Sequence, residues 1–278
     1  MSPSTEIVIM WATVTAYALS AVLFIVGFIF ARPRLVPVAF GLGILGIVPH
    51  VAAIAGRWAR VGHAPFLGFY EVISTYALVG VAAYALLVWR KPQLRPAGLV
   101  LMPIAFLGLG AAMMAPSSDM PMTAGLASYW LGIHVAFAKL SYGSFITGFG
   151  LAVVYLLRER SPRWERRLMR LPDQESIDQL GFRFSAAGLV FLGIMIVAGA
   201  IWANESWGRY WGWDPIETWS LVSWIVYAAI VHLRLTFGWR GRRFQWALVA
   251  GLPVLLFAMV GVVIIYESIH GAYLVIPK

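Results

Sequence analysis

The chain has 278 residues, of which 61% are hydrophobic and only 12% are charged, and its formal net charge is +9. A soluble domain is about half apolar and a quarter charged, so this composition excludes a soluble enzyme, a disordered chain and a nucleic-acid-binding module. It indicates a membrane protein built mostly from spanning helices. The sequence contains no cysteine, which excludes disulfides, iron–sulfur clusters and thiolate zinc sites. Any thiol in its chemistry must therefore come from a partner.

Eight apolar segments are long enough to cross a bilayer core, which takes about 20 helical residues. They are unbroken runs without the two-residue alternation of a membrane barrel, so we predict an all-α integral membrane protein. The N-terminal MSPSTE lacks the positive charges of a secretory signal, and we expect the first segment to be a retained helix. No internal repeat is visible, so residues 1–278 are predicted to form one polytopic membrane domain. The predicted spans are 7–31, 36–56, 69–89, 97–115, 128–157, 184–204, 216–237 and 244–270.

Basic residues gather on one side of the predicted helices. Cytoplasmic loops of membrane proteins carry the excess of Lys and Arg, so this bias predicts that both termini lie on the outer side of the membrane. It also explains most of the net charge. The outer side has Arg57, Arg60, Arg209 and Lys278, and Lys139 lies within a span. The other sixteen lie on the inner side: Arg32, Arg34, Arg90, Lys91, Arg95, Arg158, Arg160, Arg163, Arg166, Arg167, Arg170, Arg183, Arg234, Arg240, Arg242 and Arg243.

The longest predicted inner loop, residues 158–183, contains the run RSPRWERRLMRL. Trp164, Leu168 and Leu171 share one face of a helix in this run, and its arginines take another face. The pattern fits two interpretations equally well. One is a short amphipathic helix on the anionic inner leaflet, and the other is an ordinary charged connector.

Tryptophan is concentrated between the sixth and seventh predicted helices. Six of the 13 tryptophans fall within residues 202–224. Tryptophan favours membrane interfaces, but an interfacial belt would spread its tryptophans over all helix ends. A dense aromatic surface at the outer end better suits a large, flat, amphipathic ligand. The six residues are Trp202, Trp207, Trp211, Trp213, Trp219 and Trp224.

The run WGRYWGWDPIETWSLVSWIVYAAIVHLR resembles the tryptophan-rich WWD domain of the haem-handling membrane proteins of cytochrome c maturation. Its WGWDPIETWSL and YAAIVHLR parts are similar to the CcsA (ResC) branch of System II, whereas CcmC and CcmF share the aromatic core with a different tail. Further matches are WLGIHVAFAKLSYGSF at 130–145, GHAPFLGFYE at 62–71 and the final IHGAY, so the resemblance covers about residue 50 to the C-terminus. The chain departs from the family at Ile216, where Lys is usual, and at GVVIIYESIHGAY, where an Asn-containing GVN is frequent.

Two histidines are predicted to lie beside the tryptophan-rich loop. His134 lies about two turns into the fifth helix and His270 at the outer end of the eighth, so both reach the outer side. Imidazole is a natural ligand of haem iron, and the resemblance implies that these two are the axial ligands of an external, non-covalently held haem b. No catalytic side chain of this chain is predicted. The loop residues predicted to bind the cofactor are Trp207, Trp211, Trp213, Asp214 and Trp219, with Asp214 also capping the seventh helix.

Other polar residues receive separate predictions. His232 lies about 15 residues into the seventh helix, over ~20 Å inward, too far to share that iron. The resemblance implies that it is a possible ligand of a second haem, completed by a CcsB (ResB) partner; a structural role is the alternative. His50 and His63 are expected to be structural or to shape the external pocket. Lys139 and Arg209 are candidates to face haem carboxylates.

The resemblance implies a haem-handling subunit of a System II cytochrome c synthetase, a haem lyase. Such a protein presents haem for thioether attachment to apocytochrome c, together with a CcsB (ResB) membrane subunit and a thioredoxin-like thiol reductant. The sequence leaves open whether the chain itself is the enzyme. Alternatives are a CcmC-like protein that loads a periplasmic haem carrier and a b-type electron-transfer subunit. The electron-transfer role needs a histidine pair in each leaflet, whereas the inner side offers only His232.

Overall fold

The computed structural model describes residues 1–117, 119–160 and 171–272, and within these ranges the chain forms helices and no strand. Eight helical segments are long and apolar enough to cross a membrane. The predicted all-α class and the eight spans are therefore confirmed. In chain order the elements are α1 Pro3–Ile29, α2 Leu35–Leu45, α3 Ile47–Val61, α4 Gly68–Arg90, η1 Pro92–Ala97, α5 Gly98–Met114, η2 Ala124–Leu126, α6 Tyr129–Arg160, α8 Gln174–Trp207, α9 Pro215–Thr236, α10 Arg242–Leu256, the π-helical η3 Phe257–Gly261, α11 Val262–Ile265 and η4 Ile269–Ala272.

The second span consists of two helices, α2 and α3, that meet at Gly46. A Cβ atom on Gly46 would lie 2.8 Å from Cε1 of Tyr17 on α1. The missing side chain therefore lets the junction pack directly against α1, and the span continues to Val61.

The sixth span begins at Gln174, well before the predicted start at 184. Asp173 caps it, accepting a hydrogen bond from the backbone N–H of Ser176 at 2.8 Å. Asp178 in the added turns is buried, and its carboxylate pairs with Arg234 of α9 at 2.5 Å and with Gln245 of α10 at 2.7 Å. These partners allow a polar stretch to be a buried helix, so the inner loop is shorter than the predicted 158–183. The amphipathic run at 161–170 lies outside the described residues.

The last span ends at Ile265, so the predicted helix over 244–270 is too long. Pro253 and the π-helical η3 interrupt the regular helix. The chain then leaves the helix at Tyr266, whose backbone is extended with φ −110° and ψ 144°. His270 consequently lies on the short turn η4, and not on a helix end as predicted.

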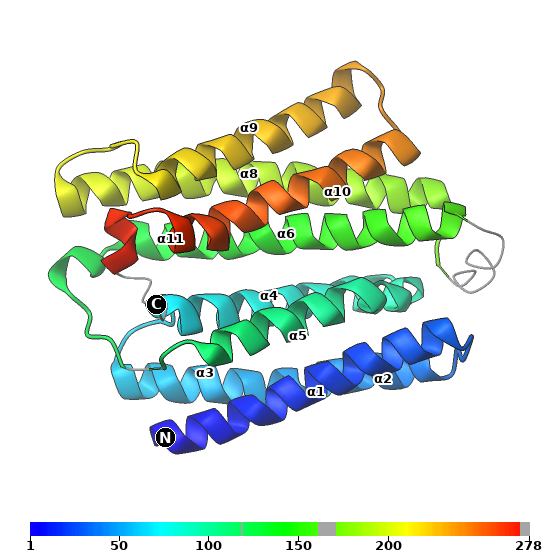
Figure 1. Ribbon diagram of the computed structural model, residues 1–278, viewed down its shortest axis with the longest axis horizontal. Helices are drawn as coiled ribbons and strands as arrows, with labels where there is room; N and C mark the ends of the chain where they lie inside the picture. Colours follow the sequence, from blue (N-terminus) through cyan, green and yellow to red (C-terminus); the bar gives the residue numbers. More distant parts are fainter. Residues whose placement is uncertain (118, 161–170, 273–278) are drawn as a thin grey trace.

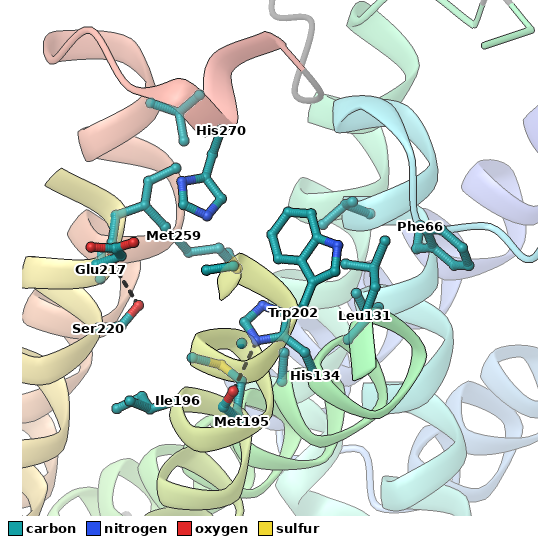
Figure 2. Close-up of a pocket in the computed structure, with 18 of the residues that line it drawn as sticks. Phe66, Leu131, His134, Met195, Ile196, Trp202, Glu217, Ser220, Met259 and His270 are labelled. Carbon is teal, nitrogen blue, oxygen red and sulfur yellow. Dashed lines mark hydrogen bonds between the residues drawn. The ribbon is translucent and has the colours of Figure 1, made fainter. Parts of the chain in front are cut away.

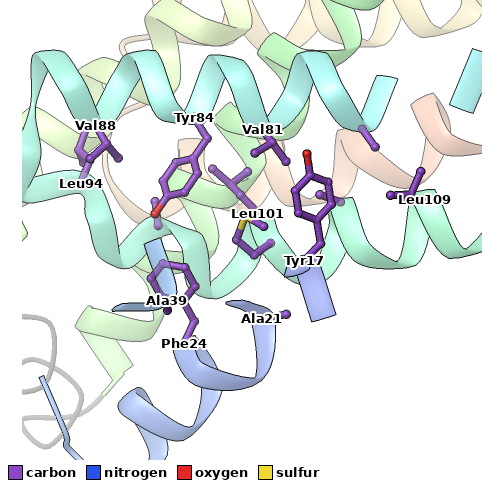
Figure 3. Packing of buried hydrophobic residues seen from close by; sticks show 14 of the residues in the cluster. Tyr17, Ala21, Phe24, Ala39, Val81, Tyr84, Val88, Leu94, Leu101 and Leu109 are labelled. Carbon is purple, nitrogen blue, oxygen red and sulfur yellow. The ribbon is translucent and has the colours of Figure 1, made fainter. Parts of the chain in front are cut away.

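The spans form two groups that lie side by side (Figure 1). Helices α1 to α5 pack around a core that includes Tyr17, Phe24 and Tyr84 (Figure 3). Helices α6, α8, α9 and α10 form the other group, where Phe145 stacks on Tyr227 with ring centroids 3.6 Å apart. The groups meet where α6 packs against α4 and α5.

The N-terminus, the α8–α9 connection and η4 lie at the same end of the bundle (Figure 1). The connection comprises residues 208–214 and is here termed the tryptophan loop. Its end of the bundle is the one predicted to face outward. That orientation stays a prediction.

Candidate functional site

A cavity lies beside the tryptophan loop, between α4, α6, α8, α9 and the last segments of the chain. Most of its wall is apolar, including Phe66 and Leu67 from the loop that precedes α4. Two of the predicted iron ligands, His134 and His270, are among the lining residues (Figure 2). Other lining residues are Tyr76, Leu131, Tyr142, Met195, Trp202, Tyr210, Trp211, Glu217, Ser220 and Met259.

The contact between α6 and α8 fixes the ring of His134. Its Nδ1 lies 2.9 Å from the backbone oxygen of Met195 on α8. A carbonyl oxygen only accepts, so this geometry assigns the proton to Nδ1 and the free lone pair to Nε2. The ring fits because residue 199, one turn further along α8, is glycine: a Cβ atom there would lie 2.5 Å from Nδ1.

His270 is held by the carboxylate of Asp214. Its Nδ1 lies 3.0 Å from Oδ1 of Asp214, which again assigns the proton to Nδ1 and leaves Nε2 with a lone pair. The same carboxylate accepts hydrogen bonds from the Ser268 hydroxyl at 2.8 Å and from the Ile269 N–H at 3.0 Å. The turn that carries His270 is therefore tied to the start of α9.

Asp214 is ionised in this environment. Burial raises the pKa of its carboxyl group, but hydrogen bonds from His270 and Ser268 and the nearby imidazole lower it more, to about 2. An anionic partner on Nδ1 increases the basicity of the opposite nitrogen of an imidazole and makes it a better metal ligand.

The two imidazoles share the cavity with tryptophan side chains. Figure 2 shows both rings in the same space beside Trp202. The Trp202 and His270 ring centroids are 6.0 Å apart, and Trp207 packs edge-on against His270 at 5.0 Å. The Nε1–H of Trp202 donates to the backbone oxygen of Gly125 at 2.8 Å, which holds the indole at the wall.

The tryptophan loop is held in a strained conformation by the first turn of α9. Trp213 has φ +58°, a left-handed conformation that is rare for a bulky residue. Oε2 of Glu217 accepts from the N–H groups of Gly212 at 2.8 Å and Asp214 at 3.1 Å, while Asp214 accepts from Ile216 at 3.0 Å. This is a capping box, and the predicted capping role of Asp214 is present.

The tryptophans that were predicted to bind the cofactor differ in how close they lie to the cavity. Trp211 lines the cavity, whereas Trp207 reaches it through its contact with His270. Trp213 is 69% exposed, and Trp219 packs against η3. Neither of these two tryptophans is a lining residue.

The remaining histidines lie away from the cavity wall. His232 is exposed on α9, with Nδ1 3.2 Å from the Thr236 hydroxyl. His50 is fully buried, and the hydroxyl of Tyr17 lies 3.1 Å from its Nδ1. His63 has its two ring nitrogens 2.9 and 2.8 Å from backbone oxygens, so both nitrogens face the protein backbone.

Sequence reasoning missed the residues that position the ligands. The Met195 carbonyl, Gly199 and Ser268 were not predicted to belong to the site. Gly199 had a signal, because it lies in the small-residue run 198–200, and small residues let membrane helices approach closely. The two predicted cations are not lining residues: Lys139 donates to the backbone oxygen of Pro65 at 3.3 Å, and Arg209 is exposed.

The arrangement suits a metal that arrives with most of its own ligands. Among the described residues no group of three or more His, Cys, Asp or Glu side chains is placed to hold a bare ion. A porphyrin supplies four nitrogens and needs only the two axial ones. The fold and the site thus define a polytopic helical membrane protein with two imidazoles facing one largely apolar cavity.

The comparisons with known proteins assign the family. The model of the cytochrome C assembly protein family matches residues 66–270, which include both cavity histidines and the tryptophan loop. The chain is 30% identical over 256 residues to the cytochrome c biogenesis protein CcsA of Guillardia theta, covering 84% of this chain and 85% of that protein. It is 33% identical over 266 residues to the protein of the same name from Parasynechococcus marenigrum (strain WH8102), covering 81% and 86%. The chain therefore belongs to the CcsA family of cytochrome c assembly proteins, as its sequence predicts.

A solved structure shares the fold. The chain superimposes on the cytochrome c haem lyase CcmF with a TM-score of 0.68 at 19% sequence identity, over 98% of this chain and 48% of that one. The chain thus spans about half the length of that structural relative.

Proposed function

We propose that this chain binds haem b through His134 and His270 and presents it at the outer face of a bacterial inner membrane for thioether attachment to apocytochrome c. The observation that carries the proposal is the pair of imidazoles in one cavity, each with Nδ1–H bound to an acceptor. This is the outer-shell arrangement that orients a histidine toward a metal with Nε2. The relatives are cytochrome c biogenesis proteins named CcsA, which supports it.

The residues present fit a haem. Iron takes two neutral imidazoles, and the flat macrocycle takes apolar and aromatic walls such as Leu131, Trp202 and Trp211. The two ligands are not equivalent, since His270 is bound to a carboxylate and His134 to a carbonyl oxygen. We expect His270 to be the stronger electron donor to the iron.

Haem is a substrate in this proposal, and the chain acts by holding and orienting it. In the coupling reaction an apocytochrome S–H adds across a haem vinyl group, sulfur bonding to one vinyl carbon and hydrogen to the other. All bond-forming groups therefore belong to the two substrates, consistent with a chain that has no cysteine. Holding two reactants in place can contribute about 7–11 kcal/mol toward the barrier.

The proposed partners would supply the thiol reductant and the second haem ligand that the reaction and His232 require. Apocytochrome thiols must be reduced to react, which requires a thiol reductant of the thioredoxin type. His232 lies exposed on α9 and distant from the cavity wall, where it can complete a second haem site only with a ligand from another subunit. We propose a CcsB (ResB) subunit for that role.

Absorption spectroscopy of the purified full chain, with and without a CcsB-type subunit, tests the proposal. Titration with haem should give a low-spin spectrum from two imidazoles. His134→Ala and His270→Ala should each weaken it, and added imidazole should restore it. In the preparation without the CcsB-type subunit, the control His232→Ala removes an exposed histidine elsewhere and should leave this spectrum intact.

Two results would contradict the proposal. One is a wild-type chain that takes up no haem in either preparation. The other is a low-spin spectrum that the His134→Ala/His270→Ala double variant retains in the preparation without the CcsB-type subunit. Transfer to a soluble haem carrier in place of apocytochrome would favour the CcmC-like alternative while leaving the ligand assignment in place.

A further inference from the structure

Two tyrosines lie at the end of the cavity furthest from the tryptophan loop. On α6 the lining residues His134, Ala138 and Tyr142 follow at intervals of four, so Tyr142 lies about 12 Å further along the helix than His134. On α4 the lining residues run from Phe69 to Tyr76, and Tyr76 is the furthest from the helix start. The Tyr76 and Tyr142 ring centroids are 5.2 Å apart.

The hydroxyl groups of these tyrosines lack protein partners in the described part of the chain, although Tyr142 is only 6% exposed. A tyrosine hydroxyl that borders a cavity and has no protein partner is free to hydrogen-bond a ligand there. The hydroxyl of Tyr227 is also unpartnered, but it is enclosed by protein and Tyr227 is not a lining residue. Tyr76 and Tyr142 differ because they border a space that a ligand can fill.

The chemistry of the pair selects an acceptor. A phenol hydroxyl donates its strongest hydrogen bonds to an ionised oxygen, and two adjacent phenols can serve one carboxylate or two.

We infer that Tyr76 and Tyr142 form a subsite for the carboxylate edge of the tetrapyrrole, an inference that rests on the proposed function. The carboxylates of haem extend from one edge of the macrocycle, several ångströms from the iron. Helical side chains lean toward the helix N-terminus, which directs the Tyr142 hydroxyl back along α6 toward His134. An iron held by His134 and His270 therefore places one edge of the ring toward the two phenols.

This placement determines which edge of haem is presented. The vinyl groups lie on the half of the macrocycle opposite the carboxylates. With the carboxylates bound at the tyrosine end, the vinyl groups face the tryptophan loop, where an incoming thiol has access. The subsite thus selects one of the orientations that two axial ligands alone would permit.

A comparison of the affinities of the chain for haem and for its carboxylate dimethyl ester tests the subsite. Both are titrated against the purified full chain by absorbance, with wild type, Tyr76→Phe, Tyr142→Phe and the double variant. Wild type should bind haem at least 10-fold more tightly than the ester. Each Phe substitution should weaken haem binding about 10-fold, the effect of one hydrogen bond to a charged group, and leave ester binding unchanged.

Tyr227→Phe is the matched control, because it removes another unpartnered buried hydroxyl outside the cavity. It should preserve the preference for haem over the ester. Wild type binding the ester as tightly as haem would overturn the subsite without any variant, and so would a double Phe variant that keeps the full preference. The spectrum that depends on His134 and His270 separates the two failures: if it is present while the preference is absent, only the subsite is wrong, and if it is absent, the proposed function is wrong.

Discussion

Gly199→Ala is the sharpest test of how the α6–α8 contact fixes His134. The new Cβ atom would lie 2.5 Å from Nδ1 and 2.9 Å from Cε1 of the imidazole. Favourable non-bonded contacts begin near ~3.5 Å, so the ring must move by about 1 Å. The hydrogen bond to the Met195 oxygen, 2.9 Å in the wild type, is then stretched beyond the limit for such bonds.

The expected effect falls on haem binding more than on folding. Alanine is favoured over glycine within a helix by roughly 0.8–1 kcal/mol, while a methyl group forced into a packed site is unfavourable by about 1–3 kcal/mol. These terms partly cancel, so the unfolding temperature should change little. Haem affinity should fall about 10–100-fold, the usual effect of losing an outer-shell partner of a metal ligand.

The assay is a haem titration by absorbance, with thermal unfolding in detergent as the companion measurement. Gly132→Ala on α6 is the control, because no atom lies within 4 Å of its added Cβ. That variant should keep the wild-type affinity. Wild-type haem binding by Gly199→Ala, or an equal loss in the control, would refute the argument that close helix packing sets the position of His134.

Three further predictions concern buried carboxylates. Asp214→Asn keeps a good helix cap but removes the anion that orients His270, so haem titration should show an affinity loss of about 10-fold or more. An unchanged affinity would show that Asp214 does not orient the ligand. The folded-state pKa of Asp214, about 2, is below its ordinary 3.8, so its stabilising contribution is complete above pH 3.8 and is lost as the pH falls through 2. Acid unfolding followed by circular dichroism should show this dependence in wild type and not in Asp214→Asn. Arg57→Ala removes a buried guanidinium 2.6 Å from Glu71 and 3.3 Å from Glu6; the loss of about 3–5 kcal/mol should appear as a lower unfolding temperature, and an unchanged temperature would argue against the buried network.

The spans were predictable because each one is a long apolar run, and hydropathy alone reports such runs. Their ends were less predictable where polar residues are buried by distant partners. The first turns of α8 contain Asp178, a polar residue that the sequence alone assigns to a loop. Its partners Arg234 and Gln245, which are distant in sequence, allow it to be buried in a helix. The early end of the last span depends similarly on contacts that residues 266–272 make with Asp214.

The candidate site likewise contains residues that the sequence predicted and residues that depend on distant contacts. The resemblance and helix depth pointed to His134 and His270, and the structure brings both to one cavity. The acceptors on their Nδ1 atoms are a backbone oxygen and a residue 56 positions away in sequence, and no local pattern reports either. Trp213 and Trp219 belong to the same motif as Trp211 but face other surroundings, since Trp213 lies in the irregular tryptophan loop and Trp219 lies on helix α9.

Asp214 unites features that are separate in the sequence. Its carboxylate caps α9, whose first turn also holds the tryptophan loop through Glu217, and it binds the turn that carries His270. His134 belongs to a different unit, the long α6–α8 pair. A partner that shifts the tryptophan loop would therefore act on one proposed axial ligand and leave the other in place. In the proposed function, this inequality lets one ligand leave the iron while the other still holds it.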